Sequence, residues 1–212
     1  MYASIFDEQR SRMVQEQLMD RGIHDFATLR AMAKIPRELF VPKILQERAY
    51  QDSALPLSKG QTISQPFIVG FMTQALRLQP DDKVLELGTG SGYQAAVAAE
   101  LAASVYSYEI VDELYRKART LLLKKLGYQN ITLKSGSGRK GLEAEAPFSK
   151  IIVTAAAEKI PQALIEQLAS PGRLIIPLKE ADGSQQLVLL KKDEQGKIQE
   201  QKLLSVIFVS LK

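Results

Sequence analysis

The sequence predicts an α/β fold in which a seven-stranded, mostly parallel sheet is covered by helices on both faces. Short apolar segments alternate with helical patterns from residue 83 onward, which is typical of a parallel sheet. In the segment 84–92, a buried strand passes into a helix through glycines at alternate positions, as in ligand-binding turns of such sheets. Two segments of alternating apolar and polar residues near residue 200 indicate an antiparallel hairpin.

Helical patterns are visible before the sheet. Apolar residues recur at helical spacing over 6–33, with a break at Gly22, and again over 67–78. Pro36 and Pro42 interrupt the segment between these helices, which is therefore expected to be rich in loops through residue 65. Residues 1–80 are thus predicted to form a helical extension of the sheet.

Residues 81–212 are predicted to form the sheet core of a single domain that spans 1–212. Five parallel strands and the two strands of the hairpin make up the seven. The strands are expected at 83–88, 104–109, 130–134, 150–154, 173–178, 185–192 and 198–209, and the helices at 92–102, 111–126 and 160–169. Gly127 is expected to end the second of these helices, because glycine readily adopts the left-handed conformation found there.

Composition excludes several kinds of site. Apolar residues make up 45% and charged residues 25% of the 212 residues, an ordinary balance for a globular domain. With no cysteine and a single histidine, His24, we expect neither a disulfide nor a metal site. The net charge of +4 is mild and the basic residues are scattered, which predicts no nucleic-acid partner. Because the sequence shows no membrane-spanning run and no signal peptide, we expect no membrane partner and a cytoplasmic location.

The turn after the first sheet strand indicates a nucleoside cofactor. It reads Val-Leu-Glu-Leu-Gly-Thr-Gly-Ser-Gly over 84–92. Glycines let the backbone approach a ligand closely, and the helix that follows presents free N–H groups to it. The third glycine stands one residue earlier than in dinucleotide-binding turns, and Glu86 would repel a pyrophosphate but attract an ammonium group. This spacing resembles the first motif of Rossmann-like methyltransferases, which bind S-adenosyl-L-methionine.

A second carboxylate fits the same cofactor. Glu109 ends the second sheet strand, 21 residues after Gly88, where an acidic residue binds ribose hydroxyls. Alternatively, Glu109 only stabilises the start of the next helix. The contacts expected from the two motifs are Glu86, Gly88, Thr89, Gly90, Ser91, Gly92 and Glu109. A nicotinamide-dependent dehydrogenase is the weakest alternative, because both the glycine spacing and Glu86 oppose it.

A third motif precedes the helix expected at 67–78. The loop 60–66 reads Gly-Gln-Thr-Ile-Ser-Gln-Pro, and Thr62 or Ser64 could simply cap that helix. The loop also resembles the signature loop of protein-L-isoaspartate O-methyltransferases. Further segments are similar to the same family: Pro-Arg-Glu-Leu-Phe-Val-Pro at 36–42, Ala-Tyr-Gln-Asp-Ser-Ala-Leu-Pro-Leu at 49–57, the cofactor turn extended to residue 96, Ala-Pro-Phe at 146–148, and Ile-Ile-Val-Thr-Ala-Ala at 151–156.

The resemblance implies a monomeric repair enzyme. It would transfer the methyl group of S-adenosyl-L-methionine to the α-carboxyl of L-isoaspartyl residues in damaged proteins and peptides. A carboxylate with a pKa of about 4 is already a nucleophile at neutral pH, so Ser64 is expected to orient it rather than to react. The family pattern makes 1–80 the part that supplies substrate loops and 81–212 the part that binds the cofactor. It adds Thr62, Ile63 and Gln65 to the cofactor contacts and assigns Leu55, Pro56, Thr154, Ala155 and Ala156 to the substrate.

The sequence departs from the family at the adenine end of the expected site. Ser137, followed by Gly138, stands where the family carries an aspartate that accepts a hydrogen bond from adenine. Ser149 and Ser210 replace a further aspartate and a proline, so that a cofactor contact near the last residues is in doubt. These departures leave open a homologue that only binds the cofactor or a partner protein. A methyltransferase of small molecules or nucleic acids is a further alternative, although the Asn/Asp-Pro-Pro-aromatic sequence of base methyltransferases is lacking.

Ser137→Asp should therefore strengthen the binding of S-adenosyl-L-methionine. The gain should be about 1 kcal/mol, the difference between a charge-assisted and a neutral hydrogen bond. Isothermal titration calorimetry of both proteins measures it. Ser184→Asp introduces the same charge just before the expected hairpin and serves as the control. An unchanged affinity, or an equal gain in the control, would contradict the prediction.

Overall fold

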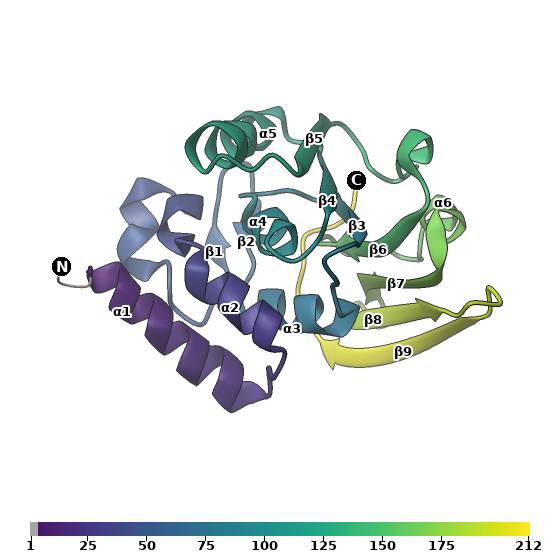
Figure 1. Ribbon diagram of the computed structural model, residues 1–212, viewed down its shortest axis with the longest axis horizontal. Helices are drawn as coiled ribbons and strands as arrows, with labels where there is room; N and C mark the ends of the chain where they lie inside the picture. The colour runs from purple at the N-terminus through teal and green to yellow at the C-terminus, as the bar shows by residue number, and fades with distance from the viewer. Residues whose placement is uncertain (1–3) are drawn as a thin grey trace.

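The computed structural model describes residues 4–212, and within them seven strands form one sheet in the order β5-β4-β3-β6-β7-β8-β9 (Figure 1). The strands are β3 (Lys83–Leu87), β4 (Ser104–Glu109), β5 (Ile131–Ser135), β6 (Phe148–Val153), β7 (Leu168–Lys179), β8 (Gln185–Lys192) and β9 (Ile198–Ser205). The first five run parallel, and the last two pair antiparallel as a hairpin. The α/β architecture expected from the alternating pattern is confirmed.

Helices cover both faces of this sheet. The α-helices are α1 (Ile5–Arg12), α2 (Phe26–Lys34), α3 (Pro66–Leu76), α4 (Tyr93–Ala99), α5 (Asp112–Arg119) and α6 (Gln162–Glu166). The π-helical segments η1 (Met13–Leu18) and η5 (Thr120–Lys125) prolong α1 and α5, and the 3₁₀ turns η2 (Met19–Arg21), η3 (Arg37–Phe40), η4 (Lys43–Arg48) and η6 (Glu143–Glu145) lie in connections. No helix within residues 4–212 is long and apolar enough to cross a membrane.

The sheet separates two hydrophobic cores. Val84 faces the larger core, which includes α2, α3, α4 and the long connection before the sheet. Leu85 and Leu87 face a smaller core that contains Leu164 of α6. Successive residues of a strand point to opposite faces, so Glu86 lies on the side of the larger core, where a carboxyl group finds few polar partners.

Local sequence explains the helix boundaries. Asp25 caps α2 by accepting a hydrogen bond from the Thr28 backbone N–H at 3.0 Å. Pro66 occupies the first turn of α3, where its missing N–H costs nothing. Gly22 adopts φ +91° and ends the first helical segment, as the break in the pattern predicts.

Several expected boundaries are wrong. The helix expected at 160–169 ends at Glu166, and β7 begins at Leu168 rather than at residue 173. Leu168 pairs with Phe148 ahead of an irregularity in the pairing, so a long-range partner extends the strand. The helix expected at 92–102 ends at Ala99, and β9 ends at Ser205 instead of residue 209. The short strands β1 (Leu55–Pro56) and β2 (Thr62–Ile63) lie in the segment expected to be rich in loops, where no strand was expected.

Candidate active site

The main cleft opens at the carboxyl ends of β3, β4 and β6, with about 880 Å³ of empty space when its open mouth is included. Its lining consists of residues 61–64, Val69, 87–91, 93–94, 108–110, 136–138, 154–155 and 208–212. β3 is flanked by β4 on one side and by β6 on the other, so the strand order changes direction next to β3. In open α/β sheets, ligands bind at such a point, outside the carboxyl ends of the strands. The cleft therefore lies where the glycine turn predicts it.

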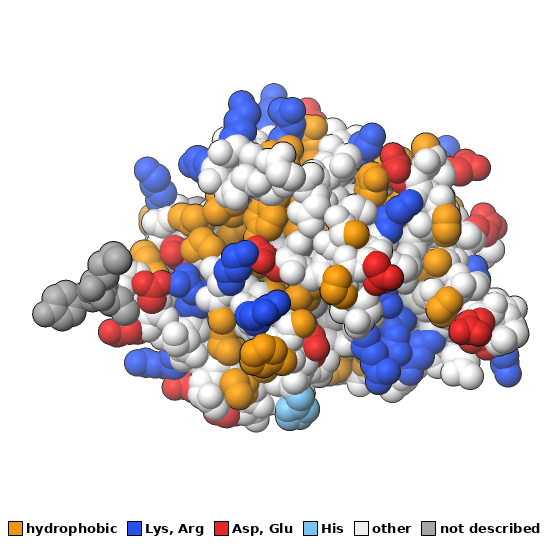
Figure 2. All heavy atoms as spheres, in the orientation of Figure 1, with side chains coloured by type: hydrophobic (Ala, Val, Ile, Leu, Met, Phe, Trp, Pro, Cys, Tyr) orange, Lys and Arg blue, Asp and Glu red, His pale blue; other side chains and the backbone are white. Residues whose placement is uncertain are grey.

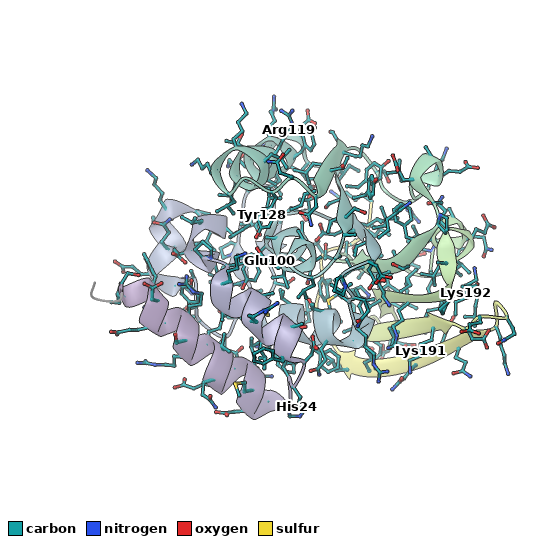
Figure 3. All side chains as sticks on the ribbon, in the orientation of Figure 1. His24, Glu100, Arg119, Tyr128, Lys191 and Lys192 are labelled. Carbon is teal, nitrogen blue, oxygen red and sulfur yellow. The ribbon has the colours of Figure 1, made fainter. Side chains whose placement is uncertain are left out.

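Most predicted site residues meet in this cleft. The lining includes Thr62, Ile63, Ser64, Gly88, Thr89, Gly90, Ser91, Glu109, Ser137, Gly138, Thr154 and Ala155. The lining does not include the predicted residues Leu55, Pro56, Gln65, Glu86, Gly92 and Ala156. Leu55 and Pro56 instead support the lining from behind, since β1 pairs antiparallel with β2 and holds Ile63 and Thr62 in register. His24 lies at the edge of the molecule, near the start of α2 (Figure 3).

The glycine loop is held from two sides. Gly88 adopts φ +97°, and a Cβ atom at this position would overlap the Oγ1 atom of Thr154. That hydroxyl donates to the Gly88 carbonyl at 2.6 Å. Gly92 adopts φ +89°, and its Cβ would lie 2.9 Å from Leu122 at the far side. Larger residues are therefore excluded, and the bare backbone of the loop faces the cleft.

Glu109 lines the cleft and is fixed by backbone groups. Its Oε2 atom accepts the N–H of Gly90 at 2.7 Å, and its Oε1 atom accepts the N–H of Val111 at 2.8 Å. A carboxylate has about four acceptor sites, so both oxygens can still accept hydroxyl donors from a ligand. The next residue, Ile110, is 47% exposed and adds an apolar surface beside the carboxylate.

Glu86 takes a different position from the one its motif suggests. The side chain is fully buried, accepts a hydrogen bond from the Ser107 hydroxyl through Oε2, and has no partner for Oε1 among the described residues. Burial raises the pKa of Glu86 to about 8, against the opposing effect of the Ser107 hydrogen bond, and the charge of Glu109 raises it further. Thr89 contacts the same Ser107 hydroxyl at 2.5 Å. Glu86 thus reaches the cleft only through Ser107 and Thr89.

Ser64 lies between two cavities. Besides the main cleft, it lines a side cleft of about 870 Å³ of empty space, which residues Ala54, Thr62, Gln65, Ile68 and 205–208 complete. The interpretation of Ser64 or Thr62 as a helix cap is wrong, because Gln65 occupies the cap position of α3 without a side-chain hydrogen bond. The Gln65 amide donates to Asp52 at 2.8 Å instead. The Ser64 hydroxyl therefore stands at the junction of the two clefts without a capping role.

The final residues of the chain form one wall of the main cleft. The Ala156 N–H donates to the carbonyl of Val209 at 2.7 Å, and the Leu211 N–H donates to the carbonyl of Ala156 at 2.8 Å. The Ser137 hydroxyl donates to the Lys212 backbone oxygen at 2.9 Å. The sequence left a cofactor contact near these residues in doubt, and residues 208 and 209 look like the continuation of a strand, whereas residues 208–212 line the cleft. Ser137 is thus bonded to the last residue in addition to facing the cleft.

Comparisons with known sequences identify relatives of this chain. Residues 8–212 match the family model described as protein-L-isoaspartate(D-aspartate) O-methyltransferase. A protein-L-isoaspartate O-methyltransferase of Gloeobacter violaceus is 51% identical over 199 residues, which cover 94% of this chain and 96% of that protein. Another from a Synechococcus species is 50% identical over 200 residues, covering 92% of this chain and 82% of that protein.

Solved structures agree with the sequence comparisons. A structure of a Plasmodium falciparum protein, assigned to the protein-L-isoaspartate O-methyltransferases and in complex with S-adenosyl-L-homocysteine, superposes with a TM-score of 0.82. It is 27% identical, and the match covers 96% of this chain and 98% of that one. A second structure described as a protein-L-isoaspartate O-methyltransferase has a TM-score of 0.84 at 26% identity, covering 95% of this chain and 65% of that one.

The buried Glu86 predicts a pH-dependent stability difference in the ligand-free protein. Its folded-state pKa of about 8 exceeds the value of 4.5 for a free side chain, so the stability contributed by the protonated group is lost as pH rises between these values. Glu86→Gln cannot ionise. The free energy of unfolding of Glu86→Gln, minus that of the wild type, should therefore increase by about 2–4 kcal/mol as pH rises from 5 to 8.

Urea denaturation of both proteins at pH 5, 6, 7 and 8 measures this difference. Glu194→Gln, at an exposed position of the hairpin turn, is the matched control and should show no comparable trend. A difference between Glu86→Gln and wild type that stays constant, or shrinks as pH rises, would refute the buried-acid interpretation.

Proposed function

The chain belongs to the protein-L-isoaspartate(D-aspartate) O-methyltransferase family, and we propose from that membership how its residues carry out the reaction. The enzyme transfers a methyl group from S-adenosyl-L-methionine to the α-carboxyl of L-isoaspartyl residues in damaged proteins and peptides. The observation that supports this reaction best is the position of Ser64, where the main cleft and the side cleft meet. One cleft would hold the methyl donor and the other the substrate chain.

The residues of the main cleft fit S-adenosyl-L-methionine. Glu109 would accept hydrogen bonds from the ribose hydroxyls, and Ile110 would pack against the base. The bare backbone at Gly88 and Gly90 would lie against the amino-acid end. At the end expected for adenine, Gly138 packs closely against the sheet, since a Cβ atom at this position would approach Leu87 to 2.7 Å.

The methyl-transfer step requires positioning rather than acid–base chemistry. When bound, the cofactor supplies an electrophilic methyl group on a positively charged sulfur. The Ser64 hydroxyl would donate a hydrogen bond to one oxygen of the isoaspartyl carboxylate and hold the other in line with that methyl group. An oxygen–carbon bond forms as the sulfur–carbon bond breaks, and no proton moves. This agrees with a cleft lining that contains no histidine among the described residues.

The side cleft is the proposed surface for the damaged peptide. Its rim carries Ile207, whose side chain is 97% exposed, and Phe208 belongs to both clefts. An exposed apolar residue beside a cleft is suited to contact a flexible peptide. Ala155, which lines the main cleft, has a small side chain and would leave space for the peptide backbone. Leu55 and Pro56 would act on the substrate indirectly, by supporting β2 and the Ser64 loop.

The remaining expectations concern assembly and location. We propose a monomer that acts in the cytoplasm and recognises neither nucleic acid nor membranes. Figure 2 shows the lysine and arginine side chains of this face in several separate groups, with acidic side chains among them. One group lies over α5, whose last turn carries Arg116, Lys117 and Arg119. Separate groups of this kind support the expectation that no continuous nucleic-acid footprint exists.

The purified chain should methylate an L-isoaspartyl peptide but not the same peptide with a normal aspartyl residue. The two peptides differ only in the position of the carboxyl group that Ser64 is proposed to orient. Transfer of a radiolabelled methyl group from S-adenosyl-L-methionine measures both reactions. Cofactor binding without methylation of either peptide would instead favour a binding module, and methylation of RNA or metabolites alone would favour another methyltransferase class.

Ser64→Ala should lower kcat/KM for the isoaspartyl peptide by about 10- to 100-fold, because a hydrogen bond to a charged group is lost. The affinity for S-adenosyl-L-homocysteine should change less than about threefold. Steady-state kinetics and calorimetry measure the two quantities. Ser170→Ala, at an exposed position of β7, is the control. A wild-type kcat/KM in Ser64→Ala would exclude the orienting role.

A further inference from the structure

Arg37 is a buried cation and the first residue of η3. Its side chain is 0% exposed. The Nε atom donates to the Ala49 carbonyl at 2.7 Å, and Nη2 donates to the Ser64 carbonyl at 2.7 Å. The Nη1 atom has no hydrogen-bond partner within residues 4–212. Burial lowers the pKa of Arg37, but an arginine stays protonated in proteins.

Within residues 4–212, no carboxylate forms an ion pair with this charge. Glu38 accepts a hydrogen bond from the Tyr50 hydroxyl and lies 4.0 Å from Arg10, which compensates its charge. The Tyr50 hydroxyl also accepts the backbone N–H of Arg37 at 3.1 Å. The groups around Arg37 are thus a paired Glu38–Arg10 unit and neutral tyrosines.

The guanidinium contacts both halves of the proposed site. Its central carbon lies 4.8 Å from the centre of the Tyr93 ring, a cation–π contact. Tyr93 is the first residue of α4, directly after the glycine loop. Its hydroxyl is also buried without a partner among residues 4–212. Arg37 therefore lies behind Ser64 and beside the start of the cofactor helix.

A purely structural role does not require the charge. A neutral amide side chain can donate to two carbonyl oxygens, whereas burying a cation without a counterion costs considerable free energy. The cost is recovered if an anion binds nearby, because charges attract strongly where water is excluded. The substrate carboxylate at the Ser64 hydroxyl is such an anion.

We propose that Arg37 is a positioning residue whose uncompensated charge makes the Ser64 site selective for an anionic carboxylate. The inference rests on the proposed role of Ser64. The carboxylate loses its charge when it becomes an ester, so Arg37 stabilises the bound substrate more than the product. Removal of the charge should therefore raise KM more than it lowers kcat, and product release is favoured in the native enzyme.

The test compares two peptides that differ by one charge. The first contains L-isoaspartate, and in the second the α-carboxyl is replaced by a neutral carboxamide. Both are titrated into the full-length enzyme saturated with S-adenosyl-L-homocysteine. In Arg37→Gln, the dissociation constant of the carboxylate peptide should rise roughly tenfold, while that of the carboxamide peptide should change less than about twofold. Arg37→Lys keeps the charge and should preserve the ratio of the two constants.

An equal loss of affinity for both peptides in Arg37→Gln would overturn the proposal and leave Arg37 with a structural role. Arg173→Gln is the matched control, since Arg173 donates to the Ala75 carbonyl at 2.9 Å at another place in the fold. If Arg37→Gln does not fold, the wild type decides: the carboxylate peptide should bind at least about tenfold more tightly than the carboxamide peptide, and equal affinities would overturn the proposal. Failure of the wild type to methylate the isoaspartyl peptide would instead refute the reaction itself.

Discussion

The close contact between Gly88 and Thr154 ties the site to the sheet. β3 and β6 are hydrogen-bonded neighbours, and the Thr154 hydroxyl occupies the space that a side chain at residue 88 would need. The hydrogen bond from this hydroxyl to the Gly88 carbonyl then sets the direction in which the loop leaves the sheet. Leu122 restricts Gly92 from the other side. The backbone between Gly88 and Gly92 is therefore fixed at both ends, and it shapes the main cleft that it lines.

Charge is distributed unevenly along this cleft. Glu109 is held by backbone N–H groups at the end proposed for the ribose. Arg37 lies buried at the other end, behind Ser64. Glu86, on β3 just before the loop, keeps its proton to higher pH than a free carboxyl does because it is buried. Burial of Glu86 thus opposes the addition of a second negative charge beneath the loop.

Sequence patterns predicted the sheet and the cofactor turn because both are encoded by neighbouring residues. Alternating apolar segments located β3 to β6, and three glycines located the turn. Contacts between distant segments were not predictable in the same way. Leu168 joins β7 only because Phe148 is its partner, and the bond from Arg37 to Ser64 spans 27 positions. Likewise, no local signal shows that Ser137 meets Lys212, 75 residues later.

The wall formed by residues 208–212 has a consequence for the order of biosynthesis. The glycine loop and Glu109 leave the ribosome about a hundred residues before this wall exists. The backbone bonds from Ala156 to Val209 and Leu211 can form only after the last of these residues has emerged. A nascent chain can therefore assemble the five parallel strands early but cannot enclose its nucleoside before synthesis reaches this segment.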